Sequence, residues 1–203
     1  AWAGCNIPVY VSVYPNDPET RASVDAAARR NPRIHIVETA EDGPTTKGDC
    51  LNHLWARLMQ DRAAGTVAVD AIILHDAEDV VDPDEPAALA HGLRSADAAQ
   101  VPVVPILGRQ GWWIRRHYGD EFAESHGKEL PVRAAIGAPM PTAGVGCAFR
   151  VAALERLGRT EGPFPSASLT EDYELGLEIA ANGGRTCFVR LRNADGVLIA
   201  SRA

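Results

Sequence analysis

The stretch AIILHDAEDVVDP, residues 71–83, joins a short apolar run to a dense set of carboxylates. The run AIIL is apolar on both faces, which is typical of a strand covered on both sides in a parallel sheet. Carboxylates repel one another and are costly to bury without a partner. The acidic residues that follow the strand therefore either face water at the start of the next helix or lie around a positive group.

The composition is that of an ordinary globular protein. The chain has 203 residues, enough for one large domain, and 46% of them are hydrophobic. A net charge of −7 argues against broad binding to nucleic acid or anionic lipid, because both prefer a basic surface. The four cysteines are scattered without a C-x-x-C pair, which indicates reduced thiols. No apolar run approaches the length of a membrane span, so we expect this chain to be soluble.

Strands and helices alternate along the first half of the sequence. Alternation from Ile7 to Val13 predicts a strand, and apolar residues at helical spacing from Leu51 to Met59 predict an amphipathic helix. The elements expected in this half are strands at 7–13, 33–37 and 71–74 and helices at 23–30, 47–60 and 82–96. This order predicts an α/β layer with a mostly parallel sheet.

The second half is less regular. The segment 100–107, QVPVVPIL, carries two prolines and can form only an edge or distorted strand. We expect helices at 111–127 and 170–184, a short strand at 144–149 and a last strand at 186–191. Neither an internal repeat nor a linker is visible, so the sequence predicts one domain over residues 1–203.

The acidic residues Asp76, Glu78 and Asp79 follow the strand at 71–74. Ligands of open α/β sheets bind outside the carboxyl ends of the strands. Two carboxylates at i and i+2 on an extended segment point the same way and together can hold a hard divalent cation, which in turn bridges nucleotide phosphates. The alternative is that these acids only place favourable charge at the start of the next helix.

Two further positions carry candidate chemistry. Lys47 lies near the first turn of a predicted helix, where a cation opposes the helix dipole unless an anion binds there; the alternative is an exposed lysine. Ser168 to Glu171 fits a capping box, which explains Glu171 structurally. Asp172 is then left to act as a base toward an acceptor hydroxyl.

The motifs together resemble the inverting GT-A glycosyltransferases of family 2. The resemblance is greatest to the branch of bacteriophage adsorption protein B, relatives of cellulose synthase, and it extends from about residue 10 to about residue 191. It rests on five segments in the family's order: YPND (14–17), TTKGDCLN (45–52), HDAEDVVDP (75–83), PTAGVGCAFR (141–150) and LTEDYELGL (169–177). It implies a Rossmann-like sheet with flanking helices that binds a nucleotide-diphosphate sugar, usually a uridine one, together with Mg²⁺ or Mn²⁺.

By position, the resemblance assigns the donor side of the site. Asn16 and Asp17 fall in the turn that meets the nucleobase or ribose, and Lys47 falls where the family's lysine meets nucleotide or phosphate. Asp76 and Glu78 match the D-x-D motif, with Glu78 the nearer match to the metal ligand. Because the motif is D-A-E here, Asp79 is a spare carboxylate and a further candidate ligand.

The resemblance also assigns the acceptor side. Asp172 of TED matches the general base, with Glu171 beside it, and residues 144–149 line the acceptor side. Trp112 and Trp113 are candidates for stacking on sugar, although ordinary core packing is the alternative.

Segments of the family pattern are missing from this sequence. A first strand ending in a P-x-x-N-E type motif has no counterpart before Ala1, and neither the downstream Q-x-x-R-W motif nor the membrane helices occur before Ala203. The resemblance implies a protein at the cytoplasmic face of the bacterial inner membrane, attached through segments that this chain does not include. The leading hypothesis is a sugar transferase acting on a glycan; the alternative is a non-catalytic nucleotide-binding or assembly module of a membrane complex.

Overall fold

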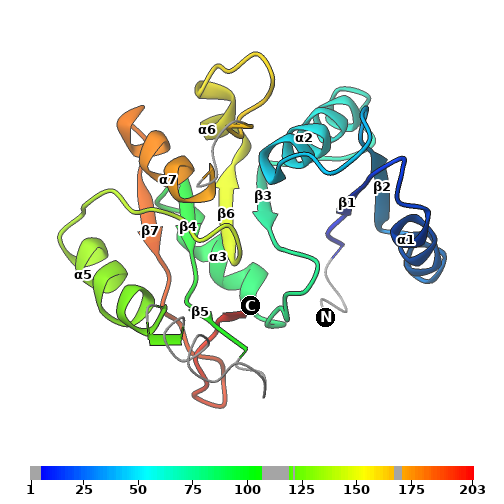
Figure 1. The fold of residues 1–203 in the computed structure, drawn as a ribbon. Helices are drawn as coiled ribbons and strands as arrows, with labels where there is room; N and C mark the ends of the chain where they lie inside the picture. The colour runs from blue at the N-terminus through cyan, green and yellow to red at the C-terminus, as the bar shows by residue number, and fades with distance from the viewer. Residues whose placement is uncertain (1–5, 107–118, 121, 167–170) are drawn as a thin grey trace. The chain divides into compact units, whose positions relative to one another are not determined.

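A computed structural model describes residues 6–106, 119–120, 122–166 and 171–203, with the side chains of 171 and 172 excepted. The chain is α/β and divides into two compact units (Figure 1). The first, here the N-terminal unit, comprises Trp2–Val69 and Gly158–Glu171, and the second, here the sheet unit, comprises Asp70–Leu157 and Asp172–Ala203.

The N-terminal unit has a β-α-β-α order: β1 is Val9–Val13, α1 Pro18–Arg30, β2 Ile34–Glu38 and α2 Lys47–Ala63. Strands β1 and β2 pair in parallel, and both helices contact both strands. This arrangement confirms the strands and helices predicted here. The strands were identified by apolar residues at every second position, and the helices by apolar residues at every third or fourth position. Each of these spacings leaves one side of its element apolar.

The sheet unit is built on four strands: β3 is Ala71–Leu74, β4 Ala98–Gln100, β6 Cys147–Arg150 and β7 Thr186–Phe188. Their order is β3-β6-β4-β7, and β6 runs antiparallel to both β3 and β4, whereas β4 and β7 are parallel. Helix α3, Glu85–Leu93, packs against β4, β6 and β7 and contributes to the core. The core residues are Ala88, Leu89, Leu93, Ala99, Val101, Ala148, Val189 and Ile199.

The distorted strand predicted at 100–107 is interrupted at its first proline. Strand β4 ends before Val101, and β5, Val103–Val104, begins after Pro102. A proline cannot donate to a strand ladder, so the pairing changes partner at this point. Strand β5 pairs in parallel with β8, Ser201–Arg202. The strand predicted at 186–191 is confirmed as β7, although it ends at Phe188. It is not the last strand, because β8 follows it and is too short to be recognised by alternation.

The remaining helices surround these strands. They are the π-helical turn η1, Ser125–Glu129, and the helices α5, Leu130–Ala135, α6, Val151–Arg156, and α7, Glu171–Ala181. The predicted helix at 111–127 falls mostly on residues outside the description, as do Trp112 and Trp113. Among the described helices, none has both the length and the apolar composition that a membrane span requires. Cys50, Cys147 and Cys187 are free thiols.

Candidate functional site

The acidic loop of the sheet unit lies between β3 and α3. Strand β3 ends at Leu74 and helix α3 begins only at Glu85, so Asp76, Glu78 and Asp79 lie in the connecting loop and not in the first helical turn. The acid in the first turn of α3 is Glu85. The D-A-E carboxylates therefore follow the carboxyl end of β3, and the acidic charge in the first turn of α3 comes from Glu85.

Within this loop the three carboxylates differ in exposure. Glu78 is exposed and Asp76 is half-buried, whereas only 1% of the Asp79 side chain is exposed. The Asp79 Oδ2 atom accepts a hydrogen bond from the backbone N–H of Asp76 at 2.8 Å. Asp76 and Glu78 are thus the two carboxylates closest to solvent, and Asp79 is turned inward.

A histidine pairs with the inward carboxylates. His75 Nδ1 lies 3.3 Å from Asp79 Oδ2, and Nε2 lies 2.7 Å from Glu85 Oε1. The second pair has the distance of an ion pair without the alignment of a good hydrogen bond. Burial acts to lower the pKa of His75, but the close polar contacts with the negatively charged Glu85 and Asp79 side chains outweigh it, so this pKa is raised. The two carboxylates therefore stabilise the charged form of the imidazole relative to an isolated histidine.

The acidic loop suits a cation that is held partly by its substrate. Within the described ranges, no group of three His, Cys, Asp or Glu side chains is arranged as a preformed metal cage. Mg²⁺ is usually bound by one or two carboxylates together with substrate phosphates and water, and a closed protein cage is not needed. The half-buried Asp76 and the exposed Glu78 are the two carboxylates of this loop that would supply hard oxygen ligands to such an open site.

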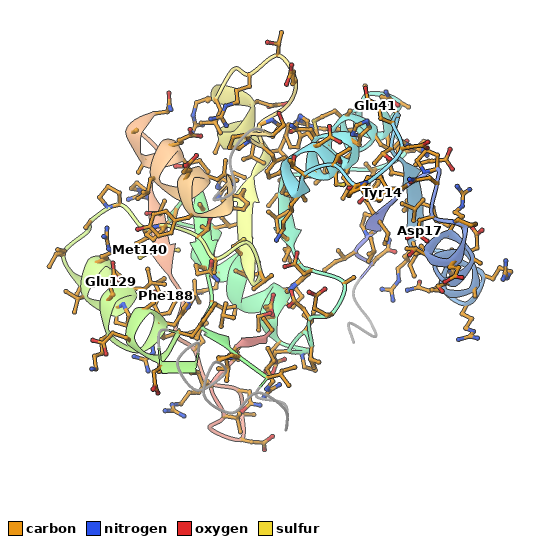
Figure 2. All side chains as sticks on the ribbon, in the orientation of Figure 1. Tyr14, Asp17, Glu41, Glu129, Met140 and Phe188 are labelled. Carbon is orange, nitrogen blue, oxygen red and sulfur yellow. The ribbon has the colours of Figure 1, made fainter. Side chains whose placement is uncertain are left out.

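In the N-terminal unit, Asn16 and Asp17 of the predicted nucleotide turn both form hydrogen bonds with other residues of the chain. The Asn16 side chain donates to the carbonyl of Gly43 at 2.7 Å and accepts from its N–H at 2.9 Å. Asp17 is the N-cap of α1 and accepts from the backbone N–H and the hydroxyl of Thr20. These two hydrogen bonds lower the pKa of Asp17. Figure 2 shows Asp17 at the start of α1 and Tyr14 on the side of α2.

The segment before α2 is ordered by side chains that the sequence did not single out. The Tyr14 hydroxyl accepts from the N–H of Thr45 at 3.1 Å and lies 3.1 Å from Cys50 Sγ. Thr46 caps α2, accepting from the N–H of Asp49 at 3.2 Å, and its hydroxyl donates to the carbonyl of Ser166 at 2.9 Å. These bonds fix the residues on either side of Lys47.

Lys47 is the first residue of α2, the position that the sequence predicted, and it is half-buried. The next residue, Gly48, is buried against the 158–166 segment, and a Cβ atom there would lie 2.7 Å from the carbonyl oxygen of Pro165. Glycine thus allows that segment to pack closely on the first turn of α2. The sequence contains no local signal for this packing, because Pro165 is far away along the chain.

The predicted acceptor segment, residues 144–149, lies beside and within β6 and is mostly buried. Gln100, only 1% exposed, holds it: Nε2 donates to the carbonyls of Val145 and Gly146, and Oε1 accepts from the N–H of Ala143. Glu171 and Asp172 begin α7, as predicted, but their side chains and the preceding residues 167–170 lie outside the description.

Comparison with known proteins gives a consistent set of relatives. The family model described as "Glycosyltransferase like family 2" matches residues 4–194. Bacteriophage adsorption protein B of Escherichia coli (strain K12) is 39% identical over 192 residues, which cover 94% of this chain and 26% of that protein. Bacteriophage N4 adsorption protein B of Escherichia coli O157:H7 is similar to the same extent. The chain thus spans about a quarter of the length of the curated relatives that it matches.

Proposed function

Because the chain belongs to the family 2-like glycosyltransferases, whose GT-A fold is Rossmann-like, we propose that it is an inverting transferase. It moves a sugar from a nucleotide-diphosphate donor, a uridine one, to a hydroxyl of a glycan. The observation that carries this proposal is the position of Asp76 and Glu78, which lie toward solvent in the loop at the carboxyl end of β3. That is where such sheets bind nucleotides.

The donor is held by charge. Asp76 and Glu78 provide the oxygen ligands of Mg²⁺ or Mn²⁺, and such an ion supplies positive charge for the diphosphate leaving group. Lys47, at the first turn of α2, adds a second positive charge toward an oxyanion, and the N-terminus of the helix favours an anion as well. Asn16, through its two bonds to Gly43, orders the turn beside the nucleoside.

The chemical step is a displacement at the anomeric carbon. Asp172 takes the proton of the acceptor hydroxyl. At the same time, the oxygen of that hydroxyl forms a bond to the anomeric carbon, on the face opposite the diphosphate leaving group. The bond from that carbon to the diphosphate oxygen breaks, and the nucleoside diphosphate leaves with the electron pair. The configuration is inverted because there is a single displacement. Glu171, beside the base in sequence, adds negative charge that favours the proton transfer.

Asp172→Asn tests the chemical step. Asparagine keeps the shape of the side chain but takes no proton at neutral pH, so sugar transfer should fall by about 10²–10⁴-fold. Donor affinity, measured by calorimetry, should hardly change because the proton comes from the acceptor. Glu174→Gln, an exposed carboxylate of the same helix, is the matched control and should leave transfer unchanged. Transfer by Asp172→Asn at the wild-type rate would rule out this base.

A second function is a nucleotide-binding module without turnover that organises a membrane complex at the cytoplasmic face. The observation in its favour is that both relatives are named as phage adsorption proteins and not as transferases. The same assay separates the two functions. If the wild-type chain binds a nucleotide but transfers no sugar across a panel of donors and glycan acceptors, the module is favoured; measurable transfer excludes it.

A further inference from the structure

The turn that carries the D-A-E motif is closed by hydrogen bonds between its two ends. The N–H of Asp79 donates to the carbonyl of Asp76 at 3.2 Å, and the N–H of Asp76 donates back to the Asp79 Oδ2 atom at 2.8 Å. Such reciprocal bonds fix the backbone from Asp76 to Asp79. The direction in which Asp76 and Glu78 project therefore depends on the Asp79 side chain.

The Asp79 carboxylate is turned away from the exposed side of the loop, with only 1% of its side chain exposed. Its Oδ1 atom is fully buried, and its Oδ2 atom is bonded to Asp76 and lies 3.3 Å from His75 Nδ1. Turning this side chain outward would break both contacts and leave the imidazole with one carboxylate. A ligand of a solvent-facing cation would need the opposite orientation.

Glu85 places a second carboxylate against the other ring nitrogen of His75. Its side chain is 0% exposed, and its Oε1 atom lies 2.7 Å from His75 Nε2. It is also the first residue of α3, where the helix dipole favours a negative charge. His75 is thus anchored to α3 through Glu85 and reaches Asp79 with its other nitrogen. The helix, the imidazole and the acidic turn form one connected unit.

We propose that Asp79 is a positioning residue, held by His75 and Glu85, that sets the geometry of Asp76 and Glu78 and does not itself bind the metal. The proposal deepens the proposed function, on which its metal readout rests. Groups that orient metal ligands without touching the ion typically change metal affinity by about 10–100-fold when they are removed. Asp79 acts on the site through a hydrogen bond, and its negative charge is not required.

The test compares Asp79→Asn with Asp79→Ala. The amide oxygen of asparagine can still accept from the N–H of Asp76, so the Mn²⁺ concentration for half-maximal uridine diphosphate binding should rise by about threefold or less. Alanine removes the acceptor, and that concentration should rise by about 10–100-fold. In Asp79→Ala the imidazole still faces Glu85, so the variant is expected to fold. If Asp79→Ala does not fold, Asp79→Ser replaces it, because the serine hydroxyl is too short to reach the N–H of Asp76.

A second readout needs neither metal nor nucleotide. Amide hydrogen exchange of Asp76, followed by NMR, should be about tenfold or more faster in Asp79→Ala than in the wild type, and nearly unchanged in Asp79→Asn. The matched control is Asp82→Ala, which removes another buried carboxylate of the same loop that accepts from the N–H of Asp84 at 3.0 Å. It should lower the melting temperature without changing the Mn²⁺ dependence.

The outcomes distinguish this inference from the proposed function. Equal loss of Mn²⁺ affinity in Asp79→Asn and Asp79→Ala would show that the charge matters, and Asp79 would be a metal ligand. Unchanged exchange of the Asp76 amide in Asp79→Ala would overturn the positioning role. If the wild type shows no Mn²⁺-dependent nucleotide binding, the proposed function fails, whereas the exchange measurement still supports or overturns the role of Asp79.

Discussion

His126 is a buried histidine that remains neutral. Its Nδ1 atom accepts from the N–H of Val103 at 3.2 Å, and its ring stacks on Phe122 and lies against Phe188. Burial lowers the pKa of His126 from 6.5 to about 4. Protonation would also set a donor against the N–H of Val103, so the neutral form is the one that β5 accommodates.

This histidine makes the stability of the protein depend on pH. Above pH 6.5 His126 is neutral in both states; between pH 6.5 and about 4 the unfolded chain takes up the proton and the folded chain does not. The free energy of unfolding should therefore fall by roughly 3 kcal/mol over this range, with no further loss from His126 below it. His126→Asn, which keeps an acceptor for Val103, should flatten this slope in urea denaturation, whereas the exposed His91→Asn should not. An equal slope in His126→Asn would contradict the assignment.

At the residue scale, the sequence predicted candidate site residues from the chemistry of their side chains. It missed the residues that contact them, because those contacts depend on the fold. The position of Asp76 and Glu78 after an apolar run was sufficient to place them at the end of a strand. His75 is adjacent to them, but its second partner, Glu85, is defined only by the packing of α3. Gln100 was likewise invisible, because the carbonyls it binds lie 45 and 46 residues away.

At the scale of elements, α2 and the segment at 158–166 are joined through Gly48. Alanine in a helix is usually more stable than glycine by about 1 kcal/mol. In Gly48→Ala the new Cβ would lie 2.7 Å from the Pro165 carbonyl oxygen, so a backbone shift is required and the sign reverses. We expect a lower free energy of unfolding by about 1–3 kcal/mol. Gly127→Ala in η1, where no atom lies within 4 Å, is the control and should be neutral or stabilising.

A Gly48→Ala variant as stable as the wild type would show that the 158–166 segment does not pack tightly on α2.

Elements with a strong apolar period, such as α2, were predictable because their burial follows from local spacing. Strand β8 and the antiparallel direction of β6 were not, since strand pairing is a long-range property that two to four residues do not encode. Helix α5 was not predicted, and the helix predicted at 111–127 overlaps only the first three residues of η1.

At the scale of the whole molecule, the proposed function requires local positive charge in a protein that is acidic overall. The net charge of −7 repels a nucleotide diphosphate, which is itself an anion, so donor binding needs local positive charge. In the proposed function, Lys47 would supply one such charge, and a divalent ion at Asp76 and Glu78 would supply the larger one. Binding of the donor is therefore expected to depend on the ion more strongly than on any single side chain.

Calorimetric titration of the wild-type chain with uridine diphosphate, with and without Mn²⁺, tests this claim most directly. We predict binding that needs Mn²⁺ and that weakens by about tenfold or more in Asp76→Asn or Glu78→Gln, because each removes a charged ligand. Exposed Asp84→Asn, in the same loop, is the control and should bind as the wild type does. Equal nucleotide affinity with and without Mn²⁺, or full Mn²⁺-dependent binding in both Asp76→Asn and Glu78→Gln, would contradict the metal-assisted site.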